Sequence, residues 1–397
     1  MKYVVSVITG SRADYGVLKY VLSRLKDNPI IELQLIITGS HLSNKFGNTE
    51  QEIMEEGYKD LTRVVLPDDD DTRSGMAFST GVVLQKFAQH FRSHVPALLL
   101  VLGDRFEAFA AASAAHLVGI PIAHISGGDV TEGAVDDAMR HCITKMSSLH
   151  FPGCEQSRRR IIQLGEQPVT VFNVGEPGVE NCLRSPLLSR QELEAAIGFP
   201  GIAGDYSVVT FHPVTLEFQS ALDHVSELIA AMDSLKEMYY VITMSNADAG
   251  GRAINKLWVA EAGRRPNWLV VSSLGVQRYL SALKYSKMVI GNSSSGIIEA
   301  PSLGIPTINI GTRQKGRMMA ESIVNCEPNR VSITEGMKKI FASEFQARLK
   351  YVISPYGNGT TSERIEEEII RFLRSPKEKT MKQFYDINFS LDDGDIL

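Results

Sequence analysis

The chain contains few cysteines, and none of them form a CxxC pair. Its 397 residues include four cysteines, which are scattered along the sequence. Without paired spacing, neither a zinc site nor a disulfide framework is expected, and a reducing cytosol fits this usage. No uncharged apolar run approaches the ~20 residues that a membrane-spanning helix requires. The N-terminal residues lack the cleavage site of a secretory signal, so we expect a cytoplasmic protein without a membrane partner.

Basic residues are not in excess either. The formal net charge is −5, whereas nucleic-acid-binding domains usually carry a basic balance, so no nucleic-acid partner is expected. The one sharp charge run, the aspartates at residues 68–71, is typical of a solvated loop. A chain of this length exceeds one ordinary core, and two or three domains are expected.

Runs of Val, Ile and Leu alternate with amphipathic segments, a pattern that predicts parallel sheets covered by helices on both faces. The pattern loosens between residues 174 and 204, where Gly and Pro indicate a domain boundary. We therefore predict an α/β chain of two doubly wound domains. The expected limits are 1–180 for the N-terminal domain, 181–365 for the C-terminal domain and 366–397 for a final helix and tail.

Individual elements follow from the same pattern. A capping box formed by Thr361 or Ser362 is expected to begin the C-terminal helix. The expected strands lie at residues 3–9, 32–38, 61–66, 97–102, 121–125, 149–151, 169–173, 206–211, 239–244, 268–272, 287–291 and 306–310.

Carboxylates gather in the segment IAHISGGDVTEGAVDDAMRH, which runs from a short strand through two glycines into a helix. Asp129, Glu132, Asp136 and Asp137 fall within nine residues. Such closeness is expected to raise the pKa of some of these carboxyls, as acid/base chemistry needs. The alternative is helix capping plus a surface ion pair between Asp136 and Arg140. Capping alone does not need four acids, so we favour chemistry. The spacing does not require a metal, although such a cluster can hold magnesium.

Two other predicted strands end in charged residues. Asp104 and Arg105 stand in LGDRFEA, and Arg12 stands in GSRADYG. Ligands of open α/β sheets bind beyond the carboxyl ends of the strands, which places Asp104 near the acidic loop. Arg12 can pair with a diphosphate through its guanidinium fork. The alternatives are structural: Asp104 caps a helix, Arg105 pairs with Glu107, and Asp14 caps the turn after Arg12. GSRADYG is neither a Walker loop nor the GxGxxG fingerprint.

In the second half, GNSSSGIIEA and GTRQKGR carry the strongest signals. Glycine and serines end a strand and open a helix, where free N–H groups and the helix dipole favour an anion. Ser293 and Ser294 can donate to phosphate oxygens, and Glu299 can accept from two ribose hydroxyls. Arg313 and Arg317 supply positive charge that serine capping does not explain.

His212 and Asn246 end two further predicted strands. A lone histidine is more often structural than functional. The anion site in the same half of the chain favours His212 as a hydrogen-bond donor to a leaving phosphate.

Taken in order, six motifs resemble those of the hydrolysing UDP-N-acetylglucosamine 2-epimerase family, over roughly residues 3–375. The motifs are VITGSRADYG, LGDRFEA, GGD…DDAMRHCITKMSSLHF, FHPVT, GNSSSGIIEAPSLGIP and INIGTRQKGR. The resemblance implies a glycosyltransferase-B architecture, with a cleft between two Rossmann-like domains and a terminal helix that crosses back to the first. It implies that proton removal at sugar carbon 2 expels UDP by anti elimination and leaves a 2-acetamidoglucal. Hydration then releases the epimeric sugar, which is N-acetylmannosamine when the substrate is UDP-N-acetylglucosamine.

The resemblance also implies residue roles, no cofactor, and a homodimer or homotetramer. The residues it points to as acids or bases are Asp104, Glu132, Asp136 and Asp137. The residues it places on UDP are Arg12, Arg105, His212, Asn246, Ser293, Ser294, Glu299 and Arg313.

One departure from the family pattern stands at Ser126. Members associated with sialic acid carry a catalytic glutamate at this position, and we expect Glu132 to take over its role. The TEGA form around Glu132 resembles a branch associated with legionaminic-type sugars, whose substrate is UDP-N,N′-diacetylbacillosamine. The substituent at sugar carbon 4 is therefore left open. Two other classes remain: a glycosyltransferase, which needs an acceptor, and a catalytically silent sensor of sugar nucleotides, which has no use for the acids.

Overall fold

The computed structural model describes residues 2–42, 49–67, 72–131, 135–213, 220–245, 251–375 and 382–388. The N-terminal domain contains β1 (Tyr3–Thr9), α1 (Arg12–Asp27), β2 (Ile31–Thr38), η1 (Gly39–Leu42), α2 (Glu50–Glu55), β3 (Leu61–Val64), α3 (Arg73–Ser93), β4 (Leu98–Leu102), α4 (Phe106–Val118), β5 (Ile122–Ile125), α5 (Val135–Met146), β6 (Leu149–Phe151), α6 (Glu155–Gln163) and η3 (Pro168–Thr170). The C-terminal domain contains α8 (Arg190–Ile197), η4 (Pro200–Ala203), β7 (Tyr206–Thr210), α9 (Ala221–Met232), β8 (Tyr239–Thr243), α10 (Gly251–Ala262), β9 (Trp268–Val271), α11 (Gly275–Tyr285), β10 (Met288–Gly291), α12 (Ser295–Ser302), β11 (Thr307–Ile310), β12 (Ile323–Cys326), α13 (Arg330–Phe341) and α14 (Ser343–Leu349).

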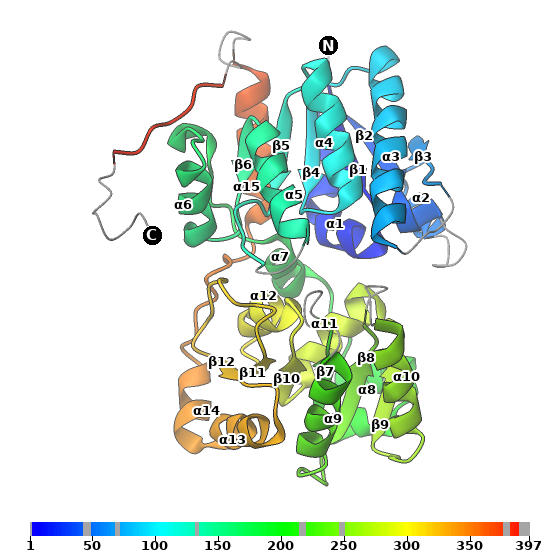
Figure 1. Ribbon diagram of the computed structural model, residues 1–397, viewed down its shortest axis with the longest axis vertical. Helices are drawn as coiled ribbons and strands as arrows, with labels where there is room; N and C mark the ends of the chain where they lie inside the picture. Colours follow the sequence, from blue (N-terminus) through cyan, green and yellow to red (C-terminus); the bar gives the residue numbers. More distant parts are fainter. Residues whose placement is uncertain are drawn as a thin grey trace.

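Two further helices join the domains. In Figure 1 the N-terminal domain stands above the C-terminal domain, with α7 (Pro177–Arg184) between them and α15 (Thr361–Leu373) returning to the upper one. The C-terminal helix therefore crosses back to the first domain, as the family resemblance implies. The domain limits at residues 180 and 365 stay predictions.

Each domain is built on a six-stranded parallel sheet. The strand orders are β3-β2-β1-β4-β5-β6 and β12-β11-β10-β7-β8-β9. Both orders reverse direction once, between β1 and β4 and between β7 and β10, as in doubly wound folds. The predicted fold of two Rossmann-like domains is confirmed. Ligands of such sheets bind beyond the carboxyl ends of the strands at these reversal points.

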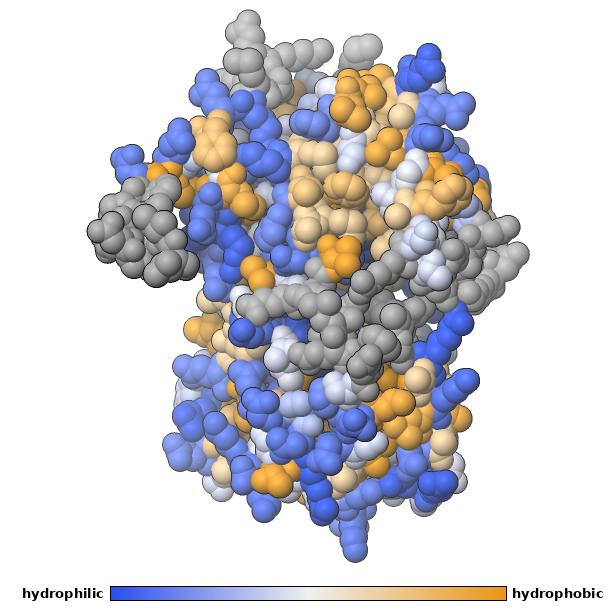
Figure 2. Space-filling model, in the orientation of Figure 1, coloured by the Kyte–Doolittle hydropathy of each residue, from blue (hydrophilic) through white to orange (hydrophobic). Residues whose placement is uncertain are grey.

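The cores explain why the strands read as continuous apolar runs. Val5 and Val7 of β1 pack with α1 and α15 on one face of the first sheet. Phe87 and Phe91 of α3 pack with α4 on the other face. Each such fully buried side chain stabilises the fold by about 2 kcal/mol. Figure 2 shows hydrophobic surface over α4 in the upper domain, where Leu117 is 79% exposed.

The start of α15 corrects one expectation. Thr361 and Ser362 do not form a capping box, because their hydroxyls bond elsewhere. Thr361 Oγ1 donates to the carbonyl of Val174 at 3.2 Å, and Ser362 Oγ donates to the Glu180 carboxylate at 2.6 Å. These contacts fix the helix to the first domain, and Ile365 completes that domain's core.

A few elements differ from the sequence expectations. The expected strand at 169–173 is wrong: η3 occupies its first part, and Val171 forms only an isolated bridge to His150. The aspartate run at 68–71 lies outside the described residues. Within the described ranges, no helix combines the length and apolar character that crossing a membrane requires.

Candidate active site

The loops after β1 and β4 meet at the reversal point of the first sheet. Arg105 Nη2 donates to Glu107 Oε1 at 2.9 Å, and the Glu107 side chain is almost fully buried. The alternative ion pair expected for Arg105 is therefore present. Burial raises the pKa of Asp14 nearby, although the charge of Arg105 opposes this rise. Asp14 does not cap α1, because Ser11 Oγ accepts from the backbone N–H of Asp14 at 3.2 Å.

Arg12 stands at the start of α1 and faces the second domain. Its Nη2 lies 3.0 Å from Glu52 Oε1. It also lies so close to Gly275 that a side-chain carbon there would approach Arg12 Nη2 to 3.2 Å. Arg12 therefore reaches the boundary between the domains, where its role on a diphosphate stays a prediction.

Arg140 organises the acidic loop. Its side chain is 4% exposed and contacts the carboxylates of both Asp104 and Asp137. It also donates to the Asp129 carbonyl at 2.9 Å and to Thr131 Oγ1 at 3.0 Å. The backbone N–H of Thr131 donates to Asp137 Oδ1 at 2.6 Å. The predicted closeness of Asp104 to the acidic loop is thus present, and Asp104 does not cap α4, which begins after Arg105 without a side-chain cap.

The other expectations for this loop have mixed outcomes. The proposed surface pair of Asp136 with Arg140 is wrong in its placement, because Arg140 is buried. Burial lowers the pKa of Arg105, but negative charges, among them Asp136, raise it overall. Asp137 and His141 share a helix face as predicted, with 3.6 Å between Oδ2 and Nε2. Glu132 lies outside the described residues.

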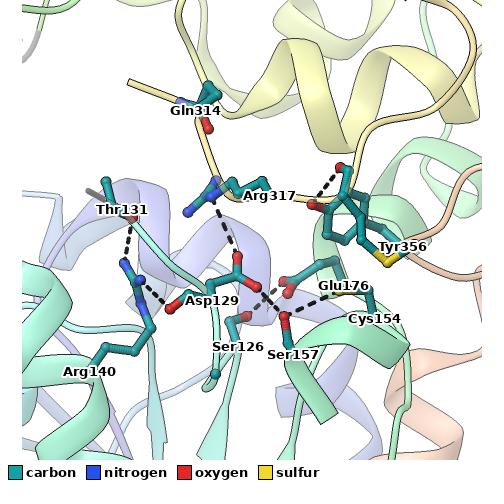
Figure 3. Close-up of polar contacts among 12 residues, drawn as sticks. Ser126, Asp129, Thr131, Arg140, Cys154, Ser157, Glu176, Gln314, Arg317 and Tyr356 are labelled. Carbon is teal, nitrogen blue, oxygen red and sulfur yellow. Dashed lines mark hydrogen bonds and ion pairs between the residues drawn. The ribbon is translucent and has the colours of Figure 1, made fainter. Parts of the chain in front are cut away.

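A second cluster contains a carboxyl that the sequence reasoning did not single out. Ser126 Oγ donates to Glu176 Oε2 at 2.7 Å, and Ser157 Oγ donates to Asp129 Oδ1 at 2.5 Å. Burial raises the pKa of Glu176, and the negative charge of Asp129 raises it further. Figure 3 shows this group beneath Arg317, which belongs to the other domain. This raised pKa belongs to Glu176, which lies outside the acidic segment for which the sequence predicted raised carboxyl pKa values.

The loops after β7 and β10 are bonded to each other in the second domain. Asn292 Oδ1 accepts from the His212 backbone N–H at 2.7 Å, and Asn292 Nδ2 donates to the His212 carbonyl at 2.8 Å. Arg313 Nη1 and Gln314 Nε2 donate to the Asn292 carbonyl at 3.1 and 2.8 Å. Burial lowers the pKa of His212 to about 3, so a neutral imidazole stands at this strand end. Asn246 lies outside the described residues.

The serine loop opens α12 at the same edge of the sheet. Ser294 is the N-cap residue of α12 but makes no side-chain capping bond, and Ser293 Oγ accepts only a long contact, 3.4 Å, from Ser295 N. Burial raises the pKa of Glu299, whose Oε2 is buried without a hydrogen-bond partner. The serine loop thus stands at a helix N-terminus, where backbone N–H groups favour negative charge, and the anion site expected there stays a prediction.

The two domains touch where these loops meet. Arg317 Nε lies 3.5 Å from Asp129 Oδ2. Gly316 lies against Val130, so that a side-chain carbon at 316 would approach Val130 Cγ1 to 3.2 Å. The structure therefore brings the acidic loop of the first domain against the GTRQKGR loop of the second. We call this contact region the domain seam, defined by Asp129, Val130, Gly316 and Arg317.

The comparisons with known proteins agree with the fold and its ordered motifs. A family model described as UDP-N-acetylglucosamine 2-epimerase matches residues 23–370. The chain belongs to this family. An Escherichia coli protein named polysialic acid biosynthesis protein P7 is 37% identical over 381 residues, covering 96% of both chains. A Campylobacter jejuni protein named GDP/UDP-N,N′-diacetylbacillosamine 2-epimerase (hydrolyzing) is 33% identical, covering 87% of this chain and 89% of the relative.

Solved structures extend the likeness in fold. A crystal structure of UDP-GlcNAc 2-epimerase from Neisseria meningitidis, bound to UDP-GlcNAc, superposes with a TM-score of 0.78 at 19% identity. It covers 94% of this chain and all of that chain. At this identity the match shows the shared two-domain fold.

Proposed function

We propose that this family member is a hydrolysing UDP-sugar 2-epimerase whose substrate lies between the two domains. The observation that supports the proposal is the contact of Asp129 with Arg317, which brings the acidic loop against the GTRQKGR loop, and Arg313 of that loop bonds to the Asn292 carbonyl just ahead of α12. In the proposed reaction, carbon 2 loses a proton and UDP departs from carbon 1. Water then adds across the new double bond, and the epimeric free sugar is released.

The acidic loop fits the proton transfers. The proton at carbon 2 is weakly acidic, so departure of UDP must run ahead and leave positive charge on the sugar ring. Carboxylates in a water-poor site stabilise such charge strongly. We assign this role to Asp104, Asp136 and Asp137, and Arg140 holds two of them in place. Glu132 stays a prediction within the same set.

The second domain fits the departing nucleotide. Arg313 is held beside the start of α12 by its bond to the Asn292 carbonyl. We assign the diphosphate to Arg313, Ser293 and Ser294, and the ribose hydroxyls to Glu299. The remaining residues proposed to contact UDP are Arg12, Arg105, His212 and Asn246.

The sugar itself is proposed to be the one in UDP-N-acetylglucosamine, with UDP-N,N′-diacetylbacillosamine as the alternative. Relatives named for sialic acid and for diacetylbacillosamine pathways both cover most of the chain, which supports this pair of candidates. Rates on the two purified UDP-sugars, measured side by side, decide between them. The substrate is identified as the UDP-sugar whose kcat/KM is at least about tenfold higher. Such a ratio corresponds to about 1.4 kcal/mol in transition-state binding.

The reaction class is tested in heavy water without an acceptor. An epimerase of the proposed kind releases free UDP and a free sugar that carries deuterium at carbon 2. A glycosyltransferase gives no turnover without an acceptor, and a silent sensor binds UDP without any turnover. Either result contradicts the proposal.

We also propose that the protein is cytoplasmic and forms a homodimer or homotetramer, which the family resemblance supports. Light scattering of the purified chain measures the oligomeric state.

A further inference from the structure

Glu176 is buried at the domain seam, and only one of its two carboxyl oxygens accepts a hydrogen bond. The residue is 6% exposed and precedes α7, the helix between the domains. Its Oε2 accepts from Ser126 Oγ, whereas its Oε1 is buried without a hydrogen-bond partner. Leaving a buried polar group unsatisfied costs about 1–3 kcal/mol. A carboxyl oxygen kept in this state can take up a proton without losing a hydrogen bond.

The surrounding chain is shaped around this carboxyl. Among the described residues, Ser126 is the one non-glycine residue with a positive φ, 59°. This conformation costs about 1 kcal/mol and aims the hydroxyl at Glu176. Gly153 lies so close that a side-chain carbon there would clash with Glu176 Oε1. The Glu176 backbone N–H donates to the Tyr356 carbonyl at 2.8 Å. Three separate segments therefore fix the position of one side chain.

The charges around Glu176 favour a carboxyl that can hold and release a proton. Burial is the main cause of its raised pKa, and the charge of Asp129 adds to it, while Arg317 opposes both. Asp129 is already bonded to Ser157 and paired with Arg317. Among the described residues, the Glu176 carboxyl is thus the member of this group that has no ion-pair partner.

The acidic loop separates Glu176 from the other carboxylates. Figure 3 shows Arg140 and Glu176 on opposite sides of Asp129. Arg140 contacts Asp104 and Asp137, so these two acids belong to its side of the loop. Inversion at carbon 2 with a proton from solvent needs one group to remove a proton and another to return it on the opposite face. The two sides of this loop supply such a pair.

Resting on the proposed function, we propose that Glu176 is a further acid/base residue whose Oε1 exchanges the proton at carbon 2. In the elimination, the C–H electron pair becomes the double bond between carbons 1 and 2, and the electrons of the broken carbon 1–oxygen bond leave on UDP. In the hydration, the oxygen of water bonds to carbon 1, an acid protonates carbon 2, and the proton lost by water restores the acid. Glu176 carries one of these two proton transfers, and Ser126 positions it.

The test compares Glu176→Gln with a matched variant on the same segment. Glu180→Gln alters another buried carboxyl, which bonds to Ser362 and Arg184 and, among the described residues, has no hydrogen bond to the domain seam. In the full-length chain, UDP release, free sugar and unsaturated sugar are measured over pH, and UDP affinity is measured by calorimetry. Glu176→Gln is expected to lower kcat about 100-fold or more, as loss of an acid/base group does. KM and UDP affinity are expected to stay within about threefold.

Further variants separate the roles. Ser126→Ala keeps the Glu176 carboxyl but removes the hydroxyl that bonds to it. We expect kcat to fall about tenfold. The pH profile of kcat is expected to shift, because the hydroxyl no longer stabilises the ionised Glu176 carboxylate. Accumulation of unsaturated sugar by Glu176→Gln assigns it to the hydration, and loss of UDP release assigns it to the elimination.

Several outcomes overturn the inference. The first is a Glu176→Gln variant with kcat within about threefold of wild type. The second is an equal loss of kcat in Glu180→Gln, which marks a structural effect. The third is loss of activity only in Glu132→Gln, which gives the role to that residue. A wild-type chain that releases no UDP from either sugar contradicts the proposed function itself, a result distinct from these three.

Discussion

Arg317 of the C-terminal domain lies 3.5 Å, Nε to Oδ2, from Asp129 of the N-terminal domain. Both side chains are largely buried, with exposed fractions of 13% and 7%. Arg317 Nε and Nη1 are buried without hydrogen-bond partners. The guanidinium therefore links the two loops and still has donors for an anionic ligand.

Replacing Arg317 by methionine is expected to lower kcat/KM for the UDP-sugar by about 10- to 100-fold. A hydrogen bond to a charged group contributes about 1.5–3 kcal/mol, which corresponds to such a loss. Steady-state kinetics measure it. Arg371→Met, which removes an exposed guanidinium paired with Glu368 on α15, is the control and should leave kcat/KM within about threefold. Equal values for wild type and Arg317→Met contradict a ligand role for Arg317.

Arg140→Met is expected to lower the free energy of unfolding by about 3 kcal/mol, because it leaves the carboxylates of Asp104 and Asp137 without their buried partner. Urea denaturation measures the change. Arg159 is 79% exposed in its pair with Glu155, so Arg159→Met should change stability by less than about 1 kcal/mol. A loss below about 1 kcal/mol for Arg140→Met refutes its organising role.

The sequence predicts the fold of this chain far better than the details of its site. Strand ends are readable because apolar runs stop at polar residues, and this placed Asp104, His212 and the serine loop at the correct edges of the sheets. The partners of Arg140 were not predictable. The i, i+4 spacing indicated Asp136, whereas the fold buries the side chain and brings it to Asp104 from another strand end.

Glu176 shows a second limit. The position of its buried carboxyl depends on Ser126, 50 positions away in sequence, and on the absence of a side chain at Gly153. Neither relationship has a local signature, although GEPG at the loosened boundary marks the place. Likewise β12 was not predicted, since its four residues are too short a run to show a strand period and they pair only at the sheet edge.

Acid stability is expected to depend on Glu166, away from the seam. His150 and Lys145 donate to its carboxylate at 3.0 and 2.8 Å, and Lys382 lies 2.7 Å from Oε2. Burial raises the pKa of Glu166, but these partners outweigh burial and lower it to about 2. Burial lowers the pKa of His150, so a neutral ring donates the bond and the lysines supply the charge.

The sign follows from linkage. An unfolded glutamate titrates near 4.3, so the stabilisation by Glu166 is complete above that pH and is lost as pH falls towards about 2. Glu166→Gln should lower the free energy of unfolding by about 2 kcal/mol at neutral pH, with a smaller difference near pH 3. Urea titrations at several pH values measure this. A difference that grows on acidification contradicts the assignment.

Glu299→Gln is expected to weaken UDP binding about tenfold, because an amide oxygen cannot accept from two ribose hydroxyls as a carboxylate does. Burial raises the pKa of Glu299, so the carboxylate gains a proton more readily as the pH drops. The affinity of the wild-type chain for UDP should therefore fall on acidification. The UDP affinity of the wild-type chain divided by that of Glu299→Gln gives a ratio in which the titration of UDP itself cancels. Calorimetry at pH 5.5 and 7.5 measures this ratio. A ratio that stays constant with pH removes Glu299 from the ribose site.

The most direct test of the account is a crystal structure of the full-length chain with bound UDP. The account predicts the diphosphate at the start of α12, within hydrogen-bond distance of Ser293 or Ser294 and of Arg313. It also predicts that the glycosyl end of the diphosphate faces the acidic loop at Asp129. UDP bound away from the domain seam, or with its diphosphate turned from that loop, contradicts the account.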